Sequence, residues 1–184
     1  IGYVSTQYGQ RPIRTVKQEI KLYNDYFNID GVFLDEAGAL TTTLSYYTSL
    51  YNYTKSLPNL RRVVLNPGMP TDIGYFKRPA ADAAVIFESY SPNWTTHTPD
   101  SYVTNFAAER FAMLAHEVPD IAAMQAAVDL AIERNFGYVY LTDDLYSPNP
   151  WDSLPSFWTD EVAYIAQQNA LLGAMLARVE LSYQ

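Results

Sequence analysis

The chain has 184 residues, and 48% of them are hydrophobic, which is enough for one substantial core and predicts a single domain over residues 1–184. Its formal net charge of −8 argues against nucleic acid or an anionic membrane as a partner, because both would need a basic face. No apolar run approaches the roughly 20 residues of a membrane span, and the absence of cysteine excludes thiolate and disulfide chemistry.

Six short apolar runs, each closed by polar or turn-forming residues, are predicted strands. They cover residues 1–6, 31–36, 62–66, 83–88, 111–116 and 137–144. Apolar residues at steps of three and four between these runs indicate helices. Helices are predicted over residues 13–27, 44–57, 99–108, 121–131 and 159–179, with little signal over 70–79 and loops over 89–99 and 147–155. Strands that alternate with helices predict a parallel sheet.

The last predicted helix begins with the acids Asp160 and Glu161, which suit the positive end of the helix dipole. Its apolar side is predicted to carry Val162, Ile165, Leu172, Leu176 and Val179.

The sheet could be an open doubly wound sheet or a closed barrel. An open sheet of this kind usually carries a glycine-rich phosphate loop after its first strand, and Ser5–Gly9 has no such fingerprint. The (β/α)₈ TIM barrel is therefore favoured, although it needs eight units and roughly 250 residues. Because the chain begins on Ile1–Val4 as if in mid-strand, we expect about six β/α units here and two units upstream. The isolated six-unit chain would then be open or unstable.

The run Gly31–Glu36 is apolar until it ends in two acids, Asp35 and Glu36. In parallel α/β proteins, chemistry gathers at the carboxyl ends of strands. Neighbouring residues on a strand point to opposite faces, so only one of the two acids need face the centre of a barrel. The alternative is that Asp35 caps a turn and Glu36 is solvated.

Polar side chains also stand at the ends of the other five predicted strands. They are Ser5, Thr6, Tyr8, Asn66, Glu88, His116, Thr142, Asp143 and Asp144. On a parallel barrel these groups would converge on one rim. Glycosidases need one carboxylic acid to protonate the leaving oxygen and one carboxylate as a nucleophile or base. The strand ends therefore predict a glycosidase site.

A metal site is the competing interpretation of these groups. Oxygen and imidazole ligands for Mg²⁺, Mn²⁺ or Zn²⁺ could come from Asp35, Glu36, Glu88, His116 and Asp143. However, only one histidine stands at a strand end and no paired-histidine spacing occurs, so we expect no metal and no other cofactor. The serine-hydrolase elbow G-x-S-x-G is also missing.

Aromatic residues make up 15% of the chain, and 16 of them are tyrosines. Most tyrosines would fill the core, but a flat ring with a polar tip also suits the face of a sugar. Trp94 and Trp151 are candidates for such stacking, with core packing as the alternative. Two sequons, at Asn52 and Asn93, would permit N-glycosylation of a secreted eukaryotic chain.

Taken in order, these motifs resemble the spherulin-4 family over essentially the whole chain. The matching segments are Ile1–Thr6, Tyr8-Gly9, Asp30–Glu36, Leu65–Gly68, Phe87-Glu88, Leu114–His116, Tyr138–Asp144 and Asn149–Asp152. The resemblance implies a (β/α)₈ barrel, often secreted, in fungi, slime moulds and bacteria. In that family, two strands precede the equivalent of Ile1.

Characterised fungal members of the family belong to glycoside hydrolase family 135 and cleave galactosaminogalactan at α-1,4-linked N-acetylgalactosamine. The acids required there correspond to Asp35, Glu36 and Glu88. The resemblance thus implies a secreted, endo-acting hydrolase of an amino-sugar polysaccharide, with Asp35 and Glu88 as the favoured catalytic pair and Glu36 as a substitute. Substrate or rim roles fall to Tyr8, Asn66, His116 and Asp143. The alternative is a non-catalytic polysaccharide-binding protein of the cell wall or spore on the same scaffold. The stereochemical course and oligomeric state are left open.

Overall fold

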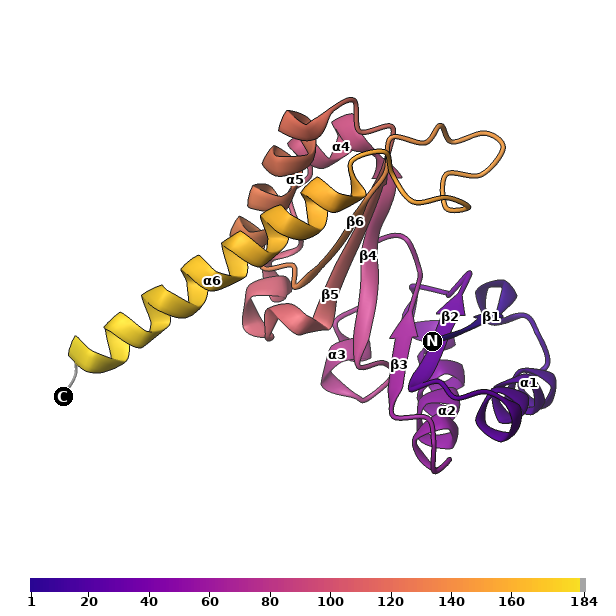
Figure 1. Ribbon diagram of the computed structural model, residues 1–184. Coiled ribbons are helices and arrows are strands. Elements are labelled where there is room, and N and C mark those ends of the chain that lie inside the picture. Colours follow the sequence, from indigo (N-terminus) through magenta and orange to yellow (C-terminus); the bar gives the residue numbers. More distant parts are fainter. Residues whose placement is uncertain (183–184) are drawn as a thin grey trace.

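The computed structural model describes residues 1–182, with side chains to residue 174, as a six-stranded parallel sheet covered by helices (Figure 1). The strands are β1 (Gly2–Ser5), β2 (Gly31–Asp35), β3 (Arg62–Leu65), β4 (Ala83–Tyr90), β5 (Phe111–His116) and β6 (Tyr138–Leu141). Each strand pairs in parallel with the next one in the chain. All six predicted strands and their parallel arrangement are confirmed.

A helix follows each strand in the chain. These helices are α1 (Ile13–Tyr26), α2 (Leu44–Lys55), α3 (Gly74–Lys77), α4 (Ser91–Thr96), α5 (Ile121–Glu133) and α6 (Trp158–Ser182). In Figure 1, α1 and α2 flank the β1–β3 half of the sheet, and α5 and α6 lie beside β5 and β6. Within residues 1–182, no helix combines the length and apolarity needed to cross a membrane.

The segment between β4 and β5 differs from the prediction. The predicted helix over 99–108 is replaced by two 3₁₀ turns, Ser101–Asn105 and Ala108–Arg110, and α4 forms inside the predicted loop. The side-chain amide of Asn135 donates to the carbonyls of Val103 and Phe106, at 2.8 and 2.9 Å. In an α-helix over 99–108, the Val103 carbonyl would accept the N–H of Ala107, so its contact with Asn135 favours the turns.

A buried tyrosine joins the ends of β1 and β2. The hydroxyl of Tyr47 accepts the backbone N–H of Gly38 at 2.7 Å and forms a hydrogen bond with Thr6 Oγ1 at 2.9 Å. Thr6 Oγ1 also lies 2.9 Å from the carbonyls of Asp35 and Glu36. Because Tyr47 and Thr6 are fully buried, this network fixes the backbone that carries the two acids.

No strand pairing joins β6 to β1 within the described residues, so the sheet has two edges. The closed eight-stranded barrel and the two upstream units stay predictions. At the β6 edge, the backbone N–H of Leu141 donates to Glu161 Oε1 at 3.1 Å. The carboxylate thus satisfies a donor that no neighbouring strand takes up.

Asp160 and Glu161 lie on the first turn of α6 as predicted, but Glu161 is only 1% exposed, so the structure buries one of these two acids. Val162 and Leu172, which were expected to face inward, are exposed. Leu176 and Val179 lie outside the residues whose side chains are described. Figure 1 shows the far end of α6 reaching away from the other elements, so the helix has neighbours only along its first part.

Burial raises the pKa of Glu161 from 4.5 to about 7. The unfolded chain therefore loses this proton at a lower pH than the folded chain does, and stability falls as pH rises from 4.5 to 7. Glu161→Gln keeps an acceptor for Leu141 and removes the charge. We expect this variant to be more stable than the parent by roughly 2 kcal/mol at pH 8, and similar to it at pH 4.5, in urea unfolding.

Asp160→Asn is the matched control, because Asp160 is the exposed neighbour on the same helical turn. An equal change in the free energy of unfolding at both pH values for Glu161→Gln would contradict the prediction.

Candidate active site

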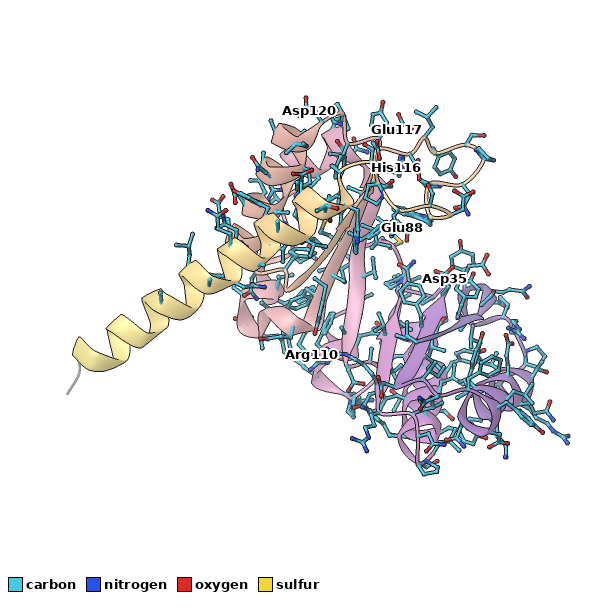
Figure 2. All side chains as sticks on the ribbon, viewed as in Figure 1. Asp35, Glu88, Arg110, His116, Glu117 and Asp120 are labelled. Atoms are coloured by element: carbon cyan, nitrogen blue, oxygen red, sulfur yellow. The ribbon has the colours of Figure 1, made fainter. Side chains whose placement is uncertain are left out.

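Two carboxylates from different strands meet at one side-chain amide. Asp35 ends β2 and Glu88 lies on β4, and Asn66 follows β3 between them. Asn66 Nδ2 donates to Asp35 Oδ1 at 2.8 Å and to Glu88 Oε2 at 2.6 Å. Figure 2 shows Asp35 and Glu88 at the same end of the sheet. The structure therefore brings together both acids of the favoured catalytic pair.

The orientation of the Asn66 amide is set by Gly68. The backbone N–H of Gly68 donates to Asn66 Oδ1 at 3.0 Å, so the amide nitrogen must face the carboxylates. Gly68 has φ of +66°, which favours glycine, and its carbonyl accepts the N–H of Glu88 at 3.0 Å. Asn66 itself is only 7% exposed. Asn66 thus holds both acids in place through its amide nitrogen. The sequence did not predict this role for it.

The bridging amide limits the distance between the two carboxylates. Asp35 Oδ1 and Glu88 Oε2 both bond to one nitrogen, so the sum of the two bonds caps their separation at about 5.4 Å. Retaining glycosidases hold their carboxyl groups about 5–5.5 Å apart, and inverting ones roughly 6.5–9.5 Å apart. The largest possible separation of these two oxygens, about 5.4 Å, thus matches retaining glycosidases and is shorter than in inverting ones.

The outer oxygen of each carboxylate also accepts a hydrogen bond. Tyr3 donates its hydroxyl to Asp35 Oδ2 at 2.7 Å, and Trp151 donates Nε1 to Glu88 Oε1 at 3.2 Å. The hydrogen bond to Asp35 raises the pKa of Tyr3 to about 12, so this hydroxyl stays protonated as a donor. Tyr3 was missed in the sequence, although it lies two residues before Ser5 and therefore on the same face of β1.

Glu36 reaches the same side of the sheet as Asp35, so both acids, and not only one of them, lie on this face. Tyr3 and Ser5 share one face of β1, and Ser5 Oγ donates to Glu36 Oε2 while Tyr3 contacts Asp35. Glu36 has φ of +49°, a left-handed conformation that breaks the alternation of the strand. Such strain costs on the order of 1–3 kcal/mol and clusters at functional sites.

His116 and Trp151 lie on the Glu88 side of the carboxylate pair. His116 ends β5 and is buried, and its ring centroid is 6.0 Å from that of Trp151, which comes from the loop between β6 and α6. His116 Nδ1 is 3.6 Å from Glu117 Oε1. Figure 2 shows His116 and Glu117 beyond Glu88, beside this loop. His116 and Trp151, which were both predicted as site residues, thus lie near the candidate catalytic acids.

Trp94 does not belong to the site. It is 1% exposed, donates Nε1 to the carbonyl of Ala127 at 3.0 Å, and packs edge-on against Phe87 and Phe136. Of the two interpretations offered for Trp94, core packing is confirmed and stacking on a sugar is wrong, because α4 turns the indole into the core.

Tyr8 and Asp143 lie at the rim rather than against the acids. Tyr8 is exposed, in a left-handed conformation with φ of +55°, and its N–H donates to the carbonyl of Glu36. Asp143 accepts the N–H of Ser156 at 2.9 Å and fixes the loop before α6. Burial alone would raise the pKa of Asp143, but the hydrogen bonds from Ser156 hold it below its usual value.

The two sequon asparagines are both exposed, Asn52 on α2 and Asn93 on α4. Their glycosylation stays a prediction. Within the described part of the chain, no three His, Asp or Glu side chains are grouped to hold a metal ion. Asp35 and Glu88 share the Asn66 amide, and Glu36 lies beside them. Carboxyl groups placed in this way can exchange protons with a ligand bound over Asn66 and can hold it in a fixed orientation.

Comparison with known proteins places the chain in a family. A solved structure of Sph3 from Aspergillus clavatus, in complex with GalNAc, matches with a TM-score of 0.77 and 21% identity, over 90% of this chain and 71% of that one. Spherulin-4 of Physarum polycephalum is 30% identical over an alignment of 178 positions that covers 92% of this chain. The chain spans about half of that relative's length, 53%.

The model of the family described as Spherulin4, spherulation-specific family 4, matches residues 1–165. This match covers the strands and the loops that carry Asp35, Asn66, Glu88 and Trp151. The chain therefore belongs to the spherulin-4 family.

Proposed function

We propose that the chain is a glycoside hydrolase that cleaves an amino-sugar polysaccharide. The observation that carries the proposal is the pair Asp35 and Glu88, which come from different strands and are held together through Asn66. The GalNAc in the complex of the similar Sph3 structure supports a hexosamine as the sugar. The sequence resemblance supports α-1,4-linked N-acetylgalactosamine and an endo-acting enzyme.

In the proposed reaction, one carboxyl group donates its proton to the glycosidic oxygen and the other carboxylate attacks the anomeric carbon. The bond between that carbon and the leaving oxygen breaks, and a covalent glycosyl-enzyme forms. A water molecule then hydrolyses the intermediate and returns a proton to the first carboxyl group. The separation of at most about 5.4 Å supports this two-step course, because it leaves no room for a water between carboxylate and sugar.

We propose as well that the chain acts outside the cell, where such a polymer would be met. The often-secreted family that the motifs resemble supports this proposal. Detection of the protein in the culture medium of its source tests it.

The second candidate is a binding protein without turnover. One observation favours it: all four oxygens of Asp35 and Glu88 accept hydrogen bonds in this structure. Acceptors fixed in this way also suit the hydroxyl and amide protons of a bound sugar. The two candidates differ in turnover, because only the hydrolase needs one carboxyl group to give up a proton.

The neutral variants Glu88→Gln and Asp35→Asn keep their shape but can neither donate a proton at the leaving oxygen nor attack. We expect each to lower kcat on a galactosamine-rich exopolysaccharide by about 10³-fold, measured as new reducing ends. Glu133→Gln, at an exposed acid near the end of α5, should retain parental activity. If the folded parent releases no reducing ends, the binding function replaces the hydrolase proposal.

The anomeric configuration of the first product tests the two-step course. Proton NMR during hydrolysis of an α-linked substrate should detect the α-anomer before mutarotation. A β-anomer as the first product would mean an inverting reaction and a wider separation of the carboxylates in the complex.

Loss of the bridging amide should affect turnover more than affinity. Asn66→Ala frees both carboxylates, so we expect kcat to fall about 100-fold with a much smaller change in KM. Asn66→Asp has nearly the same volume but no donor, and should lose at least as much activity. Parental kcat in the folded Asn66→Asp variant would show that volume, and not the donor, is what matters.

A further inference from the structure

We propose that the hollow between Glu88 and the loop of residues 142–157 is a second sugar subsite, which holds the hexosamine ring next to the bond that is cleaved. Glu88, Tyr146 and Trp151 line the hollow, and the ring of His116 lies next to those of Tyr146, Trp151 and Tyr90. The inference rests on the proposed function in so far as it takes the ligand to be an amino-sugar polymer. It adds a binding position that the carboxylate pair itself does not define.

The four rings come from three separate parts of the chain and meet in one place. Tyr90 ends β4, and His116, its partner in the register, ends β5. The centroid of the His116 ring lies 5.7 Å from that of Tyr90 and 5.5 Å from that of Tyr146. Trp151 follows at 6.0 Å from His116. Such spacing is typical of aromatic side chains that form one continuous surface.

The surface is open to a ligand and leads to the reacting groups. Tyr146 is 70% exposed and Tyr90 is 42% exposed, whereas His116 beneath them is buried. A hollow of about 340 Å³ lies between Glu88 and residues 146–151. Trp151 Nε1 bonds to Glu88 Oε1, so a sugar in the hollow would lie beside one of the two carboxylates. Exposed aromatic rings that are grouped beside a hollow are typical of a ligand-binding site.

The loop that carries two of these rings is held at several points. Ser153 donates to Asp144 Oδ2 at 2.6 Å, and Tyr140 donates to the carbonyl of Ser153 at 2.9 Å. The N–H of Tyr146 donates to Glu117 Oε1 at 3.2 Å. Figure 1 shows the loop projecting beyond the strand ends, past β4. Because the loop is anchored, its rings are presented in a fixed place, which reduces the entropy lost on binding.

The chemistry of the hollow selects the type of sugar. Aromatic rings pack on the apolar C–H face of a pyranose, and Glu88 and Glu117 at the border accept hydrogen bonds from hydroxyl and amide groups. Both border groups are acids, in a chain with a net charge of −8. A uronic acid would be repelled there, whereas a neutral or cationic hexosamine would not.

The test uses α-1,4-linked N-acetylgalactosamine oligomers of increasing length, with calorimetric binding and kcat/KM measured for each. In Tyr146→Ala, we expect about tenfold weaker affinity and about tenfold lower kcat/KM for oligomers long enough to fill the hollow, and no change for the shortest ligand. Tyr146→Phe keeps the ring and should match the parent. Tyr26→Ala removes a 77% exposed tyrosine on α1 and is the matched control.

The outcomes separate the two proposals. Weaker oligomer binding by Tyr146→Ala in a parent that hydrolyses nothing would support the subsite and overturn the hydrolase. Hydrolysis with unchanged affinity and unchanged length dependence in Tyr146→Ala would overturn the subsite and leave the hydrolase standing. Oligogalacturonate is the charge probe, and binding as tight as that of the hexosamine oligomers would contradict the proposed selectivity.

Discussion

The side-chain amide of Asn66 stands between carboxylates from β2 and β4 and holds both of them, and the rest of the site depends on this contact. Two carboxyl groups this close together need hydrogen-bond donors fixed between them. Gly68 supplies that fixation, because its N–H orients the amide and its own carbonyl holds the backbone of Glu88. A parallel sheet makes the contact possible, since β3 lies between the two strands in the register.

The ends of β1 and β2 carry the second constraint. Thr6 and Tyr47 hold the backbone at Asp35 and Glu36, and this support allows Glu36 to keep a left-handed conformation. The strain brings two adjacent acids to one face of the strand. At the opposite edge of the sheet, β6 pairs with no further strand among the described residues, and a buried acid of α6 accepts the free backbone N–H of Leu141. Buried polar side chains of this fold therefore bond to backbone groups at places where the pairing of strands ends.

The two sides of the carboxylate pair differ in chemistry. Tyr3 and Ser5 on β1 offer hydroxyl groups to Asp35 and Glu36, whereas the Glu88 side presents aromatic rings. A polymer lying across the pair would meet polar contacts at one sugar and ring stacking at the next. This asymmetry would fix the direction of the chain, and it would serve a binding protein as well as a hydrolase.

The sequence by itself determined the six strands, their parallel order and the acids at their ends, because buried parallel strands are short apolar runs closed by breakers. It also predicted Asp35, Glu88, Asn66, His116 and Trp151 as site residues. Only the tertiary structure decided that Asn66 bridges the acids, that Tyr3 joins them, that Trp94 is buried and that Glu161 is covered. These features depend on which side chains meet across residues far apart in the chain. The structure alone also decided that Glu36 is left-handed and so lies on the same side as Asp35. Local periodicity carries no information about such contacts, because it reports which face of an element is apolar and not what lies against it.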